Sequence, residues 1–283
     1  MKTKALVIAY HKYTPFGGDF YEPIFDYMLG WLKKYQDEYD KVYFIDSNWG
    51  IMPNEHIMFN MDDKATVLSV NPHLRYYDAY KEVLPQIKED LVLFLDNDFI
   101  IYKQRVIFEA FEWLKKYDVV SIYDTCGTYK TNKLNGKNKF CPYFFATRTA
   151  VLMNYRDLDW GPHMPIHETL GCLTEAMLMD GLRPYEFPDD KSNFLFGEKL
   201  GDRRSKNLGW YHIRSGSTPA YLLAHRERGD KQYTDYLKNQ PRSEYLRHFC
   251  WYQIMGGNVS PMLEDLKIGV GEWDEYVKNF RIF

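Results

Sequence analysis

Two aspartates separated by one residue follow an apolar run in the segment Leu91–Ile101 (LVLFLDNDFII). Side chains two residues apart on a strand point to the same side, so Asp96 and Asp98 should lie together. Two ionised carboxylates this close repel each other, and a cation between them would offset the repulsion. Carboxylate oxygens suit Mg²⁺ or Mn²⁺, and diphosphate oxygens can complete the shell of either ion. The pattern predicts a divalent-cation site for a diphosphate; the alternative is a turn that caps the strand.

A second group of polar residues lies in and directly after the strand-like run Trp210–Ile213. His212 is either a histidine of the core or a metal ligand, since neutral imidazole binds Mn²⁺. Arg214 and Ser215 come directly after the run and can hydrogen-bond phosphate oxygens. The alternative for Arg214 and Ser215 is an ordinary turn.

The elements that must position these residues alternate between strands and helices. Apolar, β-rich runs predict strands at Ala5–Tyr10, Lys41–Asp46, Thr66–Val70, Leu91–Ile101 and Val119–Tyr123. Apolar residues with helical spacing predict helices over Tyr21–Tyr35, Tyr76–Lys88 and Val106–Lys116, with Pro85 ending or kinking the second. This alternation predicts an α/β fold with a mostly parallel central sheet flanked by helices. Ligands of such sheets bind beyond the carboxyl ends of the strands.

The second half of the chain is predicted to be mixed at first and helical toward its end. Cys141–Met153 is interpreted as a strand and its continuation, Ile166–Met179 as a helix that stops near Gly181, and Arg183–Phe187 as a short strand. From Pro219 onward the pattern is helical, with two or three amphipathic segments. We therefore expect a catalytic domain over residues 1–217 and a helical extension over 218–283 that packs on it.

The net charge, the cysteine spacing and the length of the apolar runs argue against several classes of protein. The 283 residues are 45% hydrophobic and carry a formal net charge of −3, which argues against a surface devoted entirely to nucleic acid. The four cysteines form no CxxC pair, so a structural zinc site is not expected, and we interpret them as reduced thiols of a cytoplasmic protein. No window reaches the 18 apolar residues that would predict a membrane span.

The order of these motifs resembles that of the nucleotide-diphospho-sugar glycosyltransferases of the GT-A class. The similarity covers roughly residues 1–217 and is carried by the strand that ends in Asp96-Asn97-Asp98. Further segments in matching order are Ala5–Tyr10, Lys41–Asp46, Cys141–Thr149 (CPYFFATRT), His167-Glu168-Thr169 and Tyr211-His212-Ile213-Arg214. The resemblance implies a Rossmann-like fold, a nucleoside-diphosphate sugar as donor (a UDP-sugar by preference) and Mn²⁺ or Mg²⁺ as cofactor.

The resemblance also implies roles for residues of this chain. The end of the first strand, Ala9, Tyr10 and His11, would meet the nucleoside, and Asp46 would lie near its base or ribose. Asp96 would bind the donor through the metal, and His212 would be a third ligand beside Asp96 and Asp98. Asp98 and Glu168 would be the catalytic residues, with Glu168 as the base that accepts the acceptor's hydroxyl proton. The alternative for Glu168 is an acidic residue favoured by a helix N-terminus.

Other functions remain open at this point. A phosphotransferase similar to the haloacid dehalogenases also ends a strand in Asp-Xaa-Asp, with the first Asp as nucleophile. A nucleotidyltransferase on a related fold and a non-catalytic binding protein on an enzyme scaffold are further alternatives. The resemblance implies a glycan as acceptor. The alternative acceptor is a hydroxymethylated DNA base, whose neighbouring phosphates two predicted basic loops could contact (Lys130, Lys133, Lys137 and Lys139; Arg203, Arg204 and Lys206). The alternative for these loops is solvated surface charge.

Overall fold

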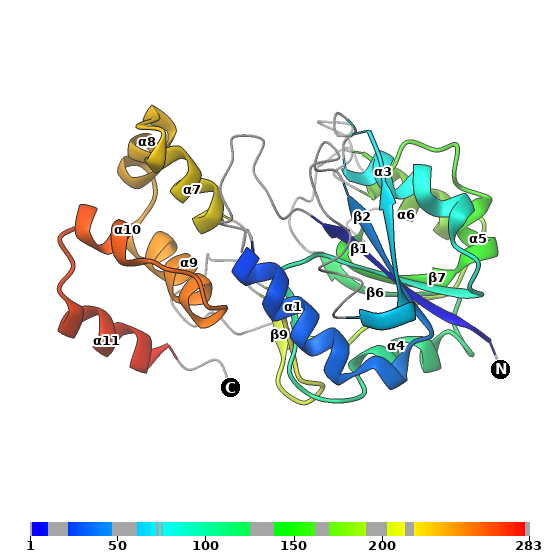
Figure 1. Ribbon diagram of the computed structural model, residues 1–283. Coiled ribbons are helices and arrows are strands. Elements are labelled where there is room, and N and C mark those ends of the chain that lie inside the picture. The colour runs from blue at the N-terminus through cyan, green and yellow to red at the C-terminus, as the bar shows by residue number, and fades with distance from the viewer. Residues whose placement is uncertain are drawn as a thin grey trace.

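The computed structural model describes residues 2–10, 22–46, 61–71, 74, 76–124, 139–161, 170–190, 203–212 and 218–280. A twisted sheet with helices on both faces forms one part of the molecule (Figure 1). A group of helices from the C-terminal part of the chain, coloured yellow to red, lies beside it. The predicted α/β class with a helical C-terminal part is therefore what the described residues form.

The main sheet has seven strands in the order β3-β2-β1-β4-β7-β6-β8 within the described part of the chain. The strands are β1 (Lys4–Tyr10), β2 (Lys41–Asp46), β3 (Ala65–Ser69), β4 (Leu91–Leu95), β6 (Val119–Asp124), β7 (Lys139–Arg148) and β8 (Pro184–Glu186). Strands β3, β2, β1 and β4 are parallel neighbours, whereas β7 runs antiparallel between β4 and β6. The prediction of a mostly parallel sheet is confirmed.

Helices cover the sheet on both faces, because the strands are apolar on both. Along β1, Leu6 and Ile8 pack into one core with α1 and α4, whereas Ala5 and Val7 pack into another with α3, α5 and α6 (Figure 1). These helices are α1 (Glu22–Lys34), α3 (Tyr76–Val83), α4 (Val106–Trp113), α5 (Thr149–Met153) and α6 (Gly171–Met179). As Pro85 predicts, α3 ends before it and continues only as a short 3₁₀ turn.

The prediction of one continuous strand over Leu91–Ile101 is wrong. Strand β4 ends at Leu95, and β5 (Phe99–Ile101) begins after a turn in which the backbone N–H of Phe99 donates to the carbonyl of Asp96 at 3.1 Å. Strand β5 belongs to a second sheet, of order β5-β10-β9, with β9 (Arg203–Ser205) and β10 (Trp210–His212). The chain leaves the main sheet at the aspartates, so they lie in a turn between two sheets.

The other predicted elements of the second half differ mainly in their bounds. Strand β7 ends at Arg148, and the chain then turns into α5 rather than extending to Met153 as a strand. Helix α6 begins at Gly171, after Leu170 in the left-handed conformation (φ 63°), and the chain reverses at Gly181 (φ 77°). The first part of the predicted helix, residues 166–169, lies outside the described residues.

The C-terminal part forms a helical layer against the small sheet. Its helices are α7 (Thr218–Glu227), α8 (Lys231–Asn239), α9 (Arg242–Ile254), α10 (Ser260–Asp265) and α11 (Val270–Asn279). They bury a third apolar core that includes Ile24 of α1, Ile100 of β5 and Tyr211 of β10. The ring of Tyr211 lies 4.6 Å from that of Trp251 in α9. The side chains of β5 alternate between this core and the main one, so the small sheet is covered on both faces.

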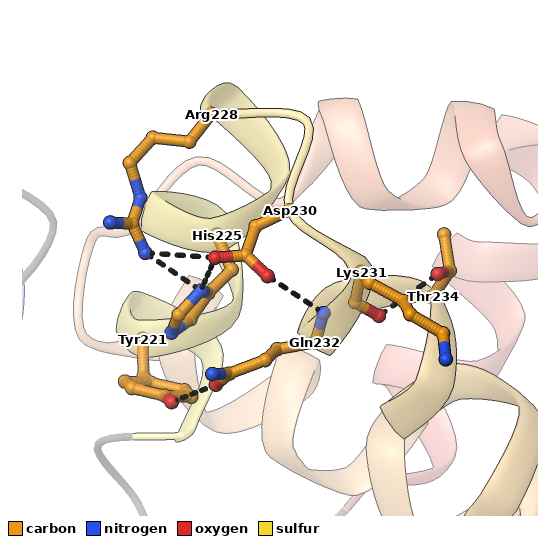
Figure 2. A network of polar contacts seen from close by, with 7 residues as sticks. All are labelled: Tyr221, His225, Arg228, Asp230, Lys231, Gln232 and Thr234. Atoms are coloured by element: carbon orange, nitrogen blue, oxygen red, sulfur yellow. Dashed lines mark hydrogen bonds and ion pairs between the residues drawn. The ribbon is translucent and has the colours of Figure 1, made fainter.

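A polar network fixes the corner between α7 and α8 (Figure 2). Nδ1 of the buried His225 lies 3.0 Å from Oδ2 of Asp230 and 2.8 Å from a guanidinium nitrogen of Arg228. Asp230 also caps α8 by accepting from the backbone N–H of Gln232 at 3.0 Å, and the Tyr221 hydroxyl donates to the Gln232 side chain. The network orders the turn between the two helices.

None of the helices in the described ranges is long and apolar enough to cross a bilayer.

Candidate metal centre

Three potential metal ligands meet at the carboxyl end of β4. Asp96 directly follows the last residue of β4, Asp98 ends the turn into β5, and His212 is the last residue of β10. Each of the three side chains offers one ligand atom, and these atoms all lie within 4.8 Å of one another. The position agrees with the rule that ligands of parallel sheets bind beyond the carboxyl ends of the strands.

The antiparallel pairing of β10 with β5 brings His212 to the aspartates. His212 is opposite Phe99, the residue that follows Asp98, and Trp210 is opposite Ile101. As a result, Nε2 of His212 lies 3.4 Å from Oδ1 of Asp98. Both side chains are buried, at 8% and 10% exposed, so water screens their interaction only weakly.

The electrostatics of Asp96 and Asp98 favour the binding of a cation. Burial and the neighbouring carboxylate of Asp98 raise the pKa of Asp96 to about 7, while His212 acts in the opposite direction. The carboxyl of Asp96 thus holds its proton far above the ordinary range of an aspartate. A cation would displace that proton and relieve the repulsion between the two carboxylates.

The donor set suits a small divalent ion. Two carboxylates and one imidazole are ligands that Mn²⁺ accepts, and the carboxylates alone suit Mg²⁺. Ligand atoms bound to one such ion at roughly 2.1 Å stand about 3–4 Å apart, and the three ligand atoms here lie within 4.8 Å of one another. The three residues fit the ion that the sequence predicts.

An aromatic residue that sequence reasoning missed completes the surroundings of His212. The ring of Tyr143 in β7 stacks on the imidazole with centroids 3.6 Å apart and planes at 9°. Tyr143 precedes Phe144, which is opposite Leu95, the last residue of β4. The sequence carries only one signal for this role, an aromatic run in CPYFFATRT whose position against β4 depends on long-range register.

The predicted nucleoside-facing residues end strands on the same edge of the sheet. Ile8 is opposite Leu95, so Ala9 and Tyr10 continue β1 past the level at which Asp96 begins. Asp46 ends β2 opposite Tyr10, is only 3% exposed, and its carbonyl accepts from the N–H of Val70 at 3.0 Å. Ala9, Tyr10 and Asp46 therefore share with Asp96 the edge where a ligand would lie.

The other predicted site residues are either outside the described ranges or in surroundings that differ from the prediction. His11, Glu168, Arg214 and Ser215 lie outside the described residues, as do most lysines of the first predicted basic loop. Arg204 is buried in strand β9, not exposed in a loop, and the N–H of Lys206 donates to the Asp190 carboxylate at 2.9 Å. Cys141, Cys172 and Cys250, the cysteines among the described residues, are free thiols.

Comparisons with known proteins give likenesses of structure only. Neither models of protein families nor curated proteins match the chain. Among solved structures, residues 1–349 of TarS from S. aureus are 13% identical, with 98% of this chain and 78% of that chain covered and a TM-score of 0.46. Glucosyl-3-phosphoglycerate synthase from Mycobacterium tuberculosis, solved with Mn²⁺, UDP and glucosyl-3-phosphoglycerate, is 14% identical over 65% of this chain and 69% of that one, with a TM-score of 0.42. A 4-diphosphocytidyl-2C-methyl-D-erythritolsynthase from Anaerococcus prevotii is 12% identical over 66% and 88%, with a TM-score of 0.44.

Proposed function

We propose that the protein is a metal-dependent glycosyltransferase that moves a sugar from a nucleoside-diphosphate sugar to an acceptor hydroxyl. The observation that carries the proposal is the convergence of Asp96, Asp98 and His212 at the carboxyl end of β4, with ligand atoms within 4.8 Å of one another. The sequence resemblance to the GT-A class supports the same site. In this proposal residues 1–217 form the catalytic domain, and residues 218–283 pack on it.

Each residue of the site has a part in the proposed reaction. Asp96 and Asp98 present their carboxylates from one short turn, and His212 presents Nε2 from the neighbouring strand. A divalent cation held there would stabilise the negative charge that grows on the departing nucleoside diphosphate. To hold the cation, Asp96 would release its proton to solvent. Asp46 and the end of β1, Ala9 to His11, would hold the nucleoside, and Arg214 and Ser215 would donate hydrogen bonds to phosphate oxygens.

The transfer breaks the bond between the anomeric carbon and the diphosphate oxygen and forms a bond from that carbon to the acceptor oxygen. In an inverting reaction, Glu168 would take the proton of the acceptor hydroxyl as general base. In a retaining reaction, the departing diphosphate can take that proton, and no protein base is needed. Product stereochemistry distinguishes these routes.

For the acceptor we propose two classes. One is a glycan, and the other is a hydroxymethylated base in DNA, which would have to be flipped out of the duplex to reach the donor. DNA binding would weaken steeply with salt because it depends on phosphate contacts, whereas binding of a neutral glycan would not. A salt-dependent gel shift with hydroxymethylcytosine DNA, compared with a glycan array, separates the classes.

The test of the donor is thermal unfolding with UDP-, GDP- and CDP-sugars, each with and without Mn²⁺ or Mg²⁺. A ligand that binds only the native protein raises its melting temperature. We expect one nucleotide sugar, with UDP-sugars the leading candidates, to raise it only when the metal is present, and the same sugar to be consumed in the presence of the acceptor. Stabilisation by nucleoside triphosphates alone would favour a nucleotidyltransferase, and a phosphoenzyme at Asp96 would favour a phosphotransferase.

A further inference from the structure

The imidazole of His212 has one aromatic ring stacked on its face and a second aromatic ring to its side. Tyr143 stacks on its face with a centroid distance of 3.6 Å and an interplanar angle of 9°. The ring of Phe99, opposite His212 in the small sheet, lies 6.3 Å away at 31°. A parallel stack this close restricts rotation of the imidazole about its bond to Cβ, because a turned ring would collide with the tyrosine.

Within the described part of the chain, nothing hydrogen-bonds to the second nitrogen of the same ring. Nδ1 of His212 is buried and finds no hydrogen-bond partner among the residues that the structure describes. A histidine that binds a metal usually donates its other N–H to a carboxylate or a carbonyl, which sets the direction of the ring. At His212 the face-to-face stack with Tyr143 fixes the plane of the ring.

The stack also joins the two sheets at the site. Phe144 is opposite Leu95, where β4 ends, so Tyr143 lies alongside the start of the aspartate turn in the main sheet. His212 comes from β10 in the small sheet. The contact between Tyr143 and His212 therefore holds one ligand at a set position relative to the other two.

We propose that Tyr143 is a positioning residue for the cation site, whose flat ring holds the plane of the His212 imidazole so that Nε2 stays directed toward Asp98. This inference rests on the proposed function, because it requires that Asp96, Asp98 and His212 bind a divalent cation. This role requires the aromatic face of Tyr143. Phenylalanine should therefore be able to substitute for the tyrosine, whereas an aliphatic side chain should not.

The test measures Mn²⁺ affinity directly, from the electron paramagnetic resonance signal of free Mn²⁺ in titrations of the full chain without donor. We expect the Mn²⁺ affinity of Tyr143→Phe to be within about twofold of the parent's. Tyr143→Leu should bind Mn²⁺ about tenfold more weakly, which is the lower end of the loss seen when a group that orients a metal ligand is removed. The matched control is Tyr185→Leu, because Tyr185 also stacks on an aromatic ring, that of Trp113, at 4.2 Å and 18°. This control should lower the melting temperature without changing Mn²⁺ affinity.

A double-mutant cycle with His212→Ala separates positioning from a general structural role. If Tyr143 acts through His212, Tyr143→Leu should change Mn²⁺ affinity by less than about twofold once the imidazole is absent. The inference is overturned if Tyr143→Leu binds Mn²⁺ as the parent does, or if its loss is as large in the His212→Ala background. A parent protein that binds no Mn²⁺ overturns the proposed cation site itself, a result distinct from either of these.

Discussion

Nε2 of His212 and Oδ1 of Asp98 lie 3.4 Å apart, although the two residues belong to segments far apart in the chain. The antiparallel register of β10 with β5 creates this contact, because His212 is opposite the residue after Asp98. The buried pair and Asp96 have ligand atoms within 4.8 Å of one another, a grouping suited to a divalent cation.

Replacing either aspartate should abolish the effect of the metal on stability. Asp96→Asn and Asp98→Asn each remove a carboxylate, and an amide oxygen is a much weaker ligand for Mn²⁺. We expect the rise in melting temperature caused by Mn²⁺ with the nucleotide sugar to disappear in both variants, measured by differential scanning fluorimetry. Asp40→Asn, at the amino end of β2, is the control and should respond like the parent. If both site variants respond like the parent, the cation binds elsewhere.

Mn²⁺ affinity should depend on pH around neutrality. Burial and Asp98 raise the pKa of Asp96 to about 7, so below that pH the cation must displace a proton from Asp96. The association constant should therefore fall by about tenfold for each pH unit below 7 and level off above it. Titrations by isothermal calorimetry between about pH 5.5 and 8, in buffers of different ionisation enthalpy, measure both the affinity and the proton released. An affinity that is flat across this range contradicts the prediction.

Without metal, the charge on Asp96 should destabilise the fold. A carboxyl whose pKa is raised on folding favours the folded state while it is protonated, and this advantage is lost as pH rises from about 4 to above 7. Asp96→Asn should therefore raise the free energy of unfolding of the metal-free protein, by up to about 4 kcal/mol at pH 8 and by little at pH 4. Urea denaturation in EDTA at the two pH values measures the difference. A variant less stable than the parent at pH 8 would assign Asp96 a structural role.

Asp118 should stabilise the other end of the sheet in a pH-dependent way. Its carboxylate accepts from the N–H of Arg183 at 2.9 Å and from the guanidinium of Arg148 at 2.8 Å, and these contacts lower its pKa. A lowered pKa contributes stability that is present above the unfolded value, about 4, and is lost as pH falls through the folded value. We expect Asp118→Ala to cost about 1–2 kcal/mol at pH 7, with the difference from the parent shrinking below pH 4. Arg183→Ala, which keeps the backbone donor and removes an exposed side chain, should cost less than about 0.5 kcal/mol.

Gly209 should be required for the turn that delivers His212. Its φ is +84°, and an added Cβ would lie 2.2 Å from Cβ of Lys103, so backbone or side chain would have to move. The Gly209 carbonyl also accepts from the N–H of Tyr102 at 2.9 Å, which ties the turn to β5. Gly209→Ala should cost about 2 kcal/mol or more in the free energy of unfolding and weaken Mn²⁺ binding. In Gly181→Ala, where φ is +77° and the space is open, only the conformational cost of about 1 kcal/mol should appear, with Mn²⁺ binding unchanged.

Local patterns in the chain were enough to predict most of the architecture. Uninterrupted apolar runs such as Leu91–Leu95 indicate strands buried on both faces, and the spacing of Ile24, Phe25, Met28 and Leu32 indicates a helix face. The Asp96-Asn97-Asp98 motif after such a run also marked the edge of the sheet where potential ligands converge. These signals lie within a few residues of one another, so a short stretch of sequence contains them.

The arrangement of the site depended on contacts between distant segments. The sequence alone indicated the strand periodicity, the parallel α/β order and the pair of acidic residues, because each arises from neighbouring side chains. Only the tertiary structure decided that the chain turns after Leu95 into a second sheet, that β10 lies against β5 so that His212 meets Asp98, and that Tyr143 stacks on the imidazole. The physical reason is register: the packing of three separate cores sets which residues of different strands face each other, and no local pattern encodes that choice.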